Sequence, residues 1–152
     1  MTNVSKDLVD ALRRSLRTRG ELRELDLLRV EEISGAVAER FVSDPGLRWW
    51  WDALRVPHRS IAYGEGDGIG CIRGLLGTER DRISMIVTDD EFPPWFGVEG
   101  NLGALSELLQ DLPYFEYFLV DDSFEWIVFD THSNTVVVAG IEHKGDSIRD
   151  AG

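Results

Sequence analysis

Several features are scarce in this chain, and each scarcity excludes a class of protein. Its 152 residues include one cysteine, Cys71, so neither an intramolecular disulfide nor a cysteine-rich structural zinc site is expected. No apolar run approaches the roughly 18 residues of a membrane-spanning helix, and the N-terminus lacks the apolar segment of a secretory signal. These absences predict a cytoplasmic protein without a membrane partner.

Positive charge is scarce in the C-terminal part of the chain. Sixteen Lys and Arg residues stand against twenty-eight Asp and Glu residues, which gives a formal net charge of −12. Residues 1–60 carry eleven cations and ten carboxylates, whereas residues 83–143 carry no Lys or Arg and twelve carboxylates. A stretch of that length would ordinarily carry about seven cations. Binding to nucleic acid is therefore not expected. A positively charged protein partner is expected instead. A solvated acidic surface without a partner is the alternative.

The first 46 residues have helical patterns. Asn3 or Ser5 is suited to cap a helix that runs to about Arg19, because leucines recur every fourth residue along one face. A second helical pattern covers about residues 21–42 and ends at a turn sequence over residues 43–46. We expect this N-terminal segment to pack on the body of the protein.

The rest of the chain predicts a sheet with interspersed helices. Residues 83–87 have the composition of a strand, and Asn101 is suited to begin an amphipathic helix. Shorter elements are expected as a strand over residues 60–63, a helix over residues 72–77 and an edge strand over residues 95–98. Three aromatic and β-branched runs with short connections predict an antiparallel meander over residues 114–120, 124–130 and 135–139.

These elements predict an α+β fold in a single domain. N-terminal helices are expected to pack on a mostly antiparallel sheet of five or six strands that ends in the three-stranded meander. The expected organisation is a helical segment over residues 1–46, an α+β core over residues 47–144 and a frayed tail over residues 145–152.

Two motifs suggest ligand binding but do not match known sites in detail. The glycine-rich stretch over residues 64–70 follows a predicted strand, as phosphate-binding loops do. It lacks the third glycine of a dinucleotide fingerprint and the Lys-Ser/Thr pair of a P-loop, and Glu65 and Asp67 would repel phosphate. Asp89, Asp90 and Glu91 form a carboxylate triplet without the spacing of a calcium loop. We therefore expect no cofactor and no metal.

No catalytic motif is complete. Asp130 and His132, two apart on a predicted strand, are expected to share a face and a hydrogen bond, as in a general-base arrangement. The sequence G-x-S-x-G is absent and Cys71 has no catalytic flank, so we predict that the chain is not an enzyme. The tryptophans Trp49–Trp51 cannot all point the same way, and one or two of them are expected in the core.

The C-terminal run PYFEYFLVDDSFEWIVFDTHSNTVVVAG carries a resemblance to known proteins. Together with RWWWDAL and FPPWFGVEGNLGALSELL, it resembles a group of small acidic bacterial proteins that are similar to immunity proteins of polymorphic toxin systems. The match covers roughly residues 47–140. The resemblance implies a domain that blocks one cognate toxin, and it implies no catalytic residues. In that group the turn often carries two adjacent histidines, where this chain has His132 and Ser133.

Charge and resemblance together predict an acidic binding protein that occludes the active groove of a basic, nuclease-type toxin. Carboxylates would mimic phosphate and an exposed aromatic would anchor the complex. The predicted partner-binding residues are Asp89, Asp90, Glu91, Trp95, Asp121, Asp122 and Glu125. The alternative hypothesis is a small-ligand binder or hydrolase-like enzyme with a pocket around His132, Asp130 and the Trp49–Trp51 cluster.

Overall fold

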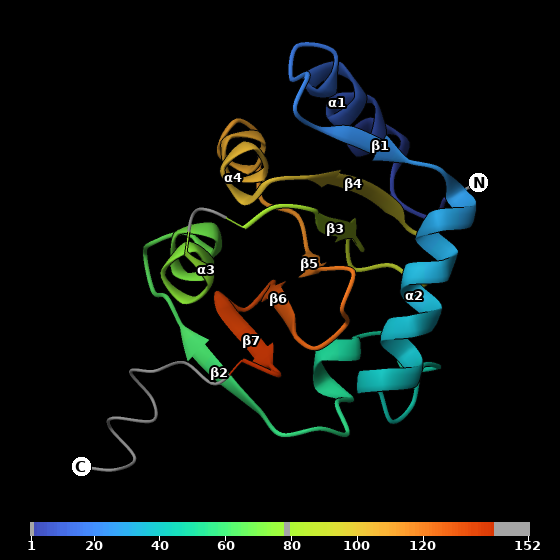
Figure 1. The fold of residues 1–152 in the computed structure, drawn as a ribbon, viewed down its shortest axis with the longest axis vertical. Coiled ribbons are helices and arrows are strands. Elements are labelled where there is room, and N and C mark those ends of the chain that lie inside the picture. The colour runs from blue at the N-terminus through green and yellow to red at the C-terminus, as the bar shows by residue number, and fades with distance from the viewer. Residues whose placement is uncertain (1, 78–79, 142–152) are drawn as a thin grey trace.

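A computed structural model describes residues 2–77 and 80–141, which are arranged around one antiparallel sheet (Figure 1). The sheet of these residues has seven strands in the order β1-β4-β3-β5-β6-β7-β2. The strands are β1 (Arg23–Leu25), β2 (His58–Ala62), β3 (Ile83–Val87), β4 (Phe96–Gly100), β5 (Tyr117–Val120), β6 (Ile127–Thr131) and β7 (Thr135–Ala139). The α+β prediction and the C-terminal meander are confirmed, with seven strands rather than five or six.

The helices begin at side-chain caps that the sequence encodes locally. They are α1 (Lys6–Leu16), α2 (Leu27–Phe41), α3 (Gly68–Leu76) and α4 (Leu102–Gln110), with a short 3₁₀ helix, η1 (Trp50–Asp52). An oxygen of each cap accepts a hydrogen bond from the backbone N–H three residues further on, and the caps are Ser5, Asp26, Asp67 and Asn101. Each such cap stabilises its helix by about 1 kcal/mol.

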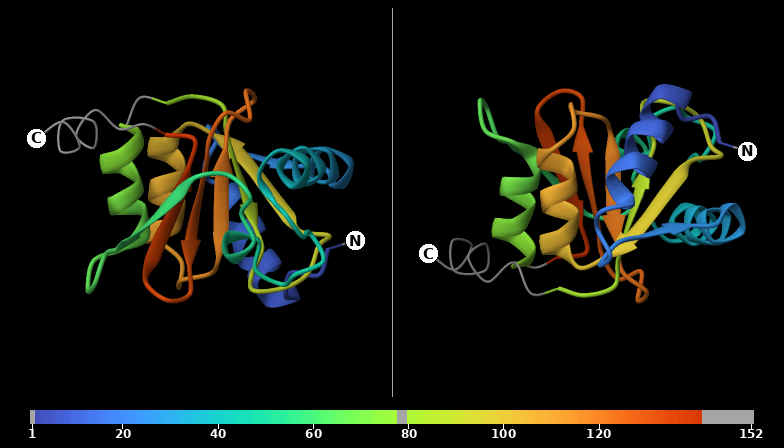
Figure 2. Two further views of the ribbon diagram at one scale, coloured as in Figure 1. Left: turned by 90° about the horizontal axis from the view of Figure 1, so that it is seen from below. Right: turned by 90° about the horizontal axis from the view of Figure 1, so that it is seen from above.

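Helices cover both faces of the sheet. Figure 2 shows α3 and α4 on one face and α2 along the other. Gly97 of β4 faces α2 so closely that a Cβ there would press against Val30, which explains the glycine. The preceding residue, Phe96, turns to the opposite face beneath the guanidinium of Arg13. α1 therefore lies on the face opposite α2.

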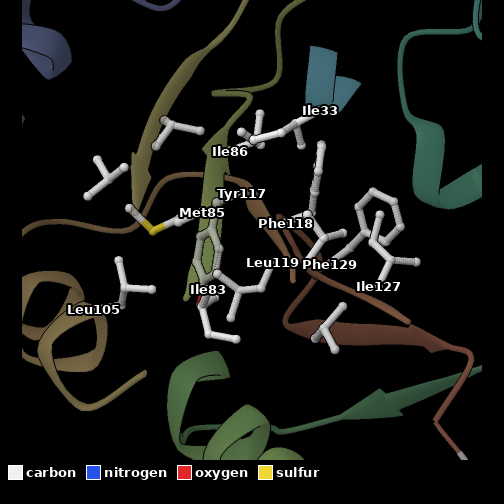
Figure 3. Close-up of a cluster of buried hydrophobic side chains, with 14 of the residues drawn as sticks. Ile33, Ile83, Met85, Ile86, Leu105, Tyr117, Phe118, Leu119, Ile127 and Phe129 are labelled. Atoms are coloured by element: carbon white, nitrogen blue, oxygen red, sulfur yellow. The ribbon is translucent and has the colours of Figure 1, made fainter. Parts of the chain in front are cut away.

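The core fills both interfaces between the sheet and the helices. Figure 3 shows Ile86 and Phe118 on the side of Ile33 of α2, whereas Met85 and Tyr117 point to the side of α3 and α4. All five side chains are at most 2% exposed. Each aliphatic or aromatic side chain buried in this way stabilises the fold by roughly 1.5–3 kcal/mol, so two packed layers hold the strands in place.

Three elements differ from the sequence-based predictions. Residues 23–25, expected inside the second helix, form β1, and α2 begins only after the Asp26 cap. β1 pairs with β4, so the predicted edge strand is an interior strand. α3 begins at Gly68, inside the predicted glycine-rich loop, because Asp67 caps it there.

The predicted frayed tail over residues 145–152 lies outside the described residues, as do residues 142–144 of the predicted core. Among residues 2–77 and 80–141, the longest helix is α2 with 15 residues. No helix in these ranges is long and apolar enough to cross a membrane.

Candidate functional site

One end of the sheet gathers polar and aromatic side chains from four separate segments. Val87, at the end of β3, lies opposite Tyr117, at the start of β5, which in turn lies opposite Asp130 near the end of β6. Residues just beyond these pairs therefore meet at the same sheet end, where the segment around η1 joins them. We call this group the rim cluster, and it consists of Trp49, Trp51, Asp90, Glu116 and His132.

Each indole of the rim cluster donates its N–H to a carboxylate. Trp49 Nε1 lies 2.6 Å from Asp90 Oδ1, and Trp51 Nε1 lies 3.0 Å from Glu116 Oε2. The two indoles stack with their centroids 5.8 Å apart, and the His132 ring lies 5.0 Å from Trp49 and 5.6 Å from Trp51. His132 Nδ1 also lies 3.3 Å from the Glu116 carboxylate and 3.4 Å from that of Asp90. The five side chains hold one another in place, with the indoles only partly buried.

Glu116 is the buried member of the rim cluster, at 5% exposure. Burial raises the pKa of its carboxyl and the neighbouring Asp90 carboxylate adds to the rise, while hydrogen bonds from Trp51 and His132 oppose it. The Thr88 hydroxyl lies 3.3 Å from Glu116 Oε1. An approaching cation would favour the ionised carboxylate and offset this cost of burial.

The loop after β3 positions Asp90. Asp89 and Asp90 have left-handed φ angles of 52° and 61°, a conformation that aspartate adopts more readily than most residues. The backbone N–H groups of Thr88 and Asp89 both donate to the carbonyl of Glu116, which ties the loop to the segment before β5. Arg48 donates to the backbone carbonyl of Asp90 and so leaves the carboxylate to the indole.

Asp90, Glu116 and His132 together have the donor atoms of a cation site. Their nearest ligand atoms all lie within 4.8 Å of one another. Two carboxylates and an imidazole suit divalent transition metals such as Zn²⁺. One oxygen of each carboxylate also accepts an indole N–H, so a metal ion would compete with those hydrogen bonds for the same acceptors. The rim cluster thus has acceptor atoms for a cationic group, whether metal ion or side chain.

Trp95, predicted as an exposed anchor for a partner, lies in the core. It is 2% exposed, and its Nε1 donates to the backbone carbonyl of Glu91 at 2.9 Å. Its ring packs edge-on against Trp50 at 4.8 Å and against Phe118 at 5.8 Å. The prediction is wrong for Trp95 because the residue precedes an interior strand and faces the α2 layer. Trp49 and Trp51 are the partly exposed indoles instead.

The six predicted partner-binding carboxylates fall at opposite ends of the sheet. Since β3 and β5 are antiparallel, the loops that follow them project from opposite ends. One loop carries Asp89, Asp90 and Glu91, and the other carries Asp121, Asp122 and Glu125. The six residues therefore do not form one continuous surface.

The loop after β5 uses much of its negative charge internally. Asp121 accepts hydrogen bonds from Ser123 and from Trp126 Nε1, and these bonds lower the pKa of its carboxyl despite its partial burial. Asp122 forms an ion pair with Arg29 at 3.3 Å. Glu125 is exposed. Both acidic loops bond to neighbouring groups, since Asp89 accepts from the Ser5 backbone N–H and Asp90 from Trp49, but the loop after β5 also carries an ion pair with an arginine.

Arginines of the N-terminal segment neutralise part of the acidic stretch. Arg19 pairs with Asp111, and Arg23 pairs with Glu99 at 2.6 Å. In the described ranges, the ion pairs of Lys and Arg reach neither the rim cluster nor the remainder of the Asp89–Glu91 loop. The basic groups beside the rim carboxylates are instead Arg48, which donates to the backbone carbonyl of Asp90, and the His132 ring.

Asp130 and His132 do not form the predicted hydrogen bond. Asp130 Oδ1 accepts from the Tyr63 hydroxyl at 2.9 Å, whereas His132 contacts Glu116 and Asp90. Asp130 pairs with Tyr117 on the strand face that α3 covers, and His132 lies beyond the end of β6. The cavity that Asp130 lines contains neither His132 nor a tryptophan, so the single pocket of the alternative hypothesis is not formed.

Gly68 provides a test of how closely α3 approaches Asp130. A Cβ at Gly68 would overlap the Asp130 carboxylate, whereas a Cβ at Gly74 in the same helix meets nothing within 4 Å. We expect Gly68→Ala to lower the free energy of unfolding by about 1–3 kcal/mol through overpacking. Gly74→Ala should raise it by up to about 1 kcal/mol through helix propensity. Urea denaturation of both variants checks this pair, and equal effects would contradict the close approach.

Several residues of the site lie outside the sequence-based predictions. Glu116 has a recognisable signal, because it is a single carboxylate between Phe115 and Tyr117 in an apolar run, and a buried charge needs partners. Tyr63 and Tyr114 have no local signal. They bind Asp130 across 67 and 16 residues of sequence, and only the sheet register brings them together.

No family model, curated protein or solved structure matches this chain. The similarity to immunity proteins is therefore a hypothesis carried by the sequence of residues 47–140. A functional hypothesis also rests on the geometry of the rim cluster and on the charge around it.

Proposed function

We propose that this protein is a non-catalytic inhibitor of a basic, nuclease-type toxin domain, with the rim cluster at the centre of its binding surface. The observation that carries the proposal is the placement of two partly exposed indoles beside two carboxylates at one end of the sheet, where Arg48 bonds the backbone of Asp90 and not its carboxylate. Tryptophans are frequent anchors of protein interfaces. Carboxylates beside them can accept the guanidinium groups with which a nuclease holds phosphate.

Exposed apolar side chains occur in the segments that carry the rim residues. Leu47, Phe92 and Tyr114 are 49%, 45% and 53% exposed. They belong to the segments that carry the rim residues, namely those before η1, after β3 and before β5. The Phe92 ring also lies 5.9 Å from the guanidinium carbon of Arg48. Single exposed apolar residues are ordinary, but three that each stand two residues from a rim residue along the chain favour a protein contact.

Electrostatic attraction supports the same kind of partner. The chain carries a net charge of −12, and its N-terminal arginines neutralise carboxylates away from the rim. Such a charge distribution raises the association rate with a basic protein by about 10- to 1,000-fold, and salt weakens the effect. The proposal therefore predicts fast, salt-sensitive association.

The test measures inhibition of the nuclease domain of a toxin encoded beside the gene for this chain. The wild-type protein is expected to abolish DNA or RNA cleavage at equimolar concentration. A triple variant, Asp89→Asn with Asp90→Asn and Glu91→Gln, should associate at least about tenfold more slowly at low salt. Its association rate should also depend less on salt. Stopped-flow measurements at two salt concentrations check both expectations.

A matched control removes the same charge away from the rim. Glu107→Gln, Asp122→Asn and Glu125→Gln together neutralise three exposed carboxylates outside the rim end, and this variant should keep most of the wild-type association rate. A nuclease domain that stays fully active in excess protein, or the lack of any adjacent toxin gene, would overturn the proposal. Equal slowing by both triple variants would overturn the assignment of the rim cluster.

A further inference from the structure

A cavity of about 330 Å³ lies on the face of the sheet opposite α2, at the start of α3. Tyr63, Tyr114, Tyr117 and Asp130 supply much of its polar lining, and leucines of α4 and of the segment after it supply apolar walls. Its size is at the lower end of the range for small-molecule sites, about 300–1,000 Å³. The cavity is separate from the rim cluster, because no residue of that cluster lines it.

Asp130 places a carboxyl group in the wall of this cavity. The residue is 3% exposed, and its Oδ1 accepts one hydrogen bond from the Tyr63 hydroxyl. None of the residues that line the cavity is Lys, Arg or His. A buried carboxylate without a cation in the same cavity is costly, so a positively charged ligand would be favoured there.

Tyr117 adds a second buried polar group. Its hydroxyl has no partner at ideal hydrogen-bond geometry, but it interacts with the nearby Asp130 carboxylate and lowers the pKa of that carboxyl. Buried hydroxyls are normally paired. The Tyr114 hydroxyl, in contrast, donates to the Asp130 backbone carbonyl at 2.9 Å. The cavity thus presents the Asp130 carboxylate with the Tyr117 hydroxyl beside it, and the Asp67 carboxylate that caps α3, among aromatic and apolar walls.

We infer that this cavity binds a small organic cation, namely an ammonium or guanidinium head on an apolar stem. The head would pair with the Asp130 carboxylate and donate to the Tyr117 hydroxyl oxygen, and tyrosine faces favour cations. The stem would lie against Leu109 and Leu112. Either a free amine or a Lys or Arg side chain of another protein has this chemistry. The inference does not rest on the proposed inhibitor function.

The test titrates the full chain with n-butylammonium and n-butylguanidinium, with n-butanol as the neutral control, and follows the tyrosine resonances by NMR. At least one cation is expected to bind saturably and the alcohol much more weakly. Binding should be roughly tenfold weaker at pH 5 than at pH 8, because an Asp130 pKa of about 6 leaves about one tenth of the carboxyl ionised at pH 5. N-acetyl-lysine methylamide is the probe for a protein side chain, and binding of either this probe or the free amines supports the site.

Three variants separate the site from general charge effects. Asp130→Asn should abolish cation binding, and Tyr117→Phe should weaken it severalfold while the fold is kept, because phenylalanine preserves the buried ring. Glu107→Gln, which removes an exposed carboxylate on α4, should leave the affinity unchanged. Equal binding of the alcohol, or full affinity in a folded Asp130→Asn variant, would overturn the inference. If Asp130→Asn does not fold, unchanged affinity in Tyr117→Phe together with no pH dependence would overturn it.

Discussion

Replacing Trp95 by alanine is expected to lower the free energy of unfolding by about 3–5 kcal/mol. The side chain is 2% exposed and packs edge-on against Trp50 and Phe118, so its removal leaves a cavity between the sheet and the α2 layer. The lost N–H also leaves the Glu91 carbonyl without that hydrogen bond. Domains of this size have a total stability of about 5–15 kcal/mol, so the variant should be close to unfolding at 37 °C. Guanidinium denaturation followed by circular dichroism measures the loss.

Trp51→Ala is the matched comparison for this prediction. Trp51 is only partly buried, and its ring stacks on Trp49 while its N–H bonds Glu116. We expect this change to cost about 1–2 kcal/mol of stability and to raise the dissociation rate of a bound toxin domain. A Trp95→Ala protein as stable as wild type that has lost partner binding would show that Trp95 is the anchor after all.

Local sequence signals predict those elements whose stabilisation is local. Ser5 and Asn101 act as the helix caps that the sequence predicts, because a cap needs only the three residues that follow it. Residues 83–87 form a strand because all five side chains are buried, which an apolar run of that length indicates. The meander follows in the same way from short turns between aromatic and β-branched runs.

The sequence does not predict elements whose formation depends on partners far away in the chain. β1 has three residues of mixed polarity and forms only because it pairs with β4, about 75 residues later in the chain. The start of α3 is rich in glycine, which disfavours a helix. Glycine is needed at position 68 because the helix approaches Asp130 so closely that no side chain fits there. A short window of sequence contains neither cause.

The site shows the same division. Asp90 is predictable as part of a carboxylate triplet and His132 as a turn histidine, but their contact requires the register of β3, β5 and β6. Charge counting also overstates the acidic surface. Of the predicted partner-binding carboxylates, Asp121 bonds an indole and Asp122 pairs with Arg29. Hydrogen bonds and ion pairs with other side chains thus compensate carboxylates that composition alone counts as unpaired.

Asp130→Asn is expected to change the pH dependence of stability. Burial raises the pKa of Asp130 to about 6 from an ordinary value of 3.8, although hydroxyls of Tyr117 and Tyr63 oppose the rise. The folded chain therefore holds this proton to higher pH than the unfolded chain does. The stabilisation that this group adds to the free energy of unfolding is greatest below pH 4. It decreases as the pH rises and is gone at about pH 7. Between pH 4.5 and pH 7.5 the loss amounts to about 2 kcal/mol.

Burial keeps the tyrosine and cysteine groups around Asp130 protonated across this pH window. Burial raises the pKa values of Tyr63, Tyr114 and Tyr117 above their ordinary value of 10, and burial together with Asp130 raises that of Cys71. Two charged residues complete the surroundings. Asp67, at the cap of α3, raises the pKa of Asp130, and Arg59 of β2 opposes the rise of the Cys71 pKa. The raised pKa of the Asp130 carboxyl thus couples its protonation to folding.

The measurement is urea denaturation of the wild type and of Asp130→Asn at pH 4.5, 6.0 and 7.5. Asparagine keeps the shape and the acceptor for Tyr63 but carries no charge, so the variant should gain about 2 kcal/mol relative to wild type between the lowest and the highest pH. Glu116 also has a raised pKa, but it is common to both proteins and cancels in their difference. Parallel stability profiles for the two proteins would mean that Asp130 is not buried as an uncompensated acid, and with that result the electrostatic case for a cation in the cavity would be lost as well.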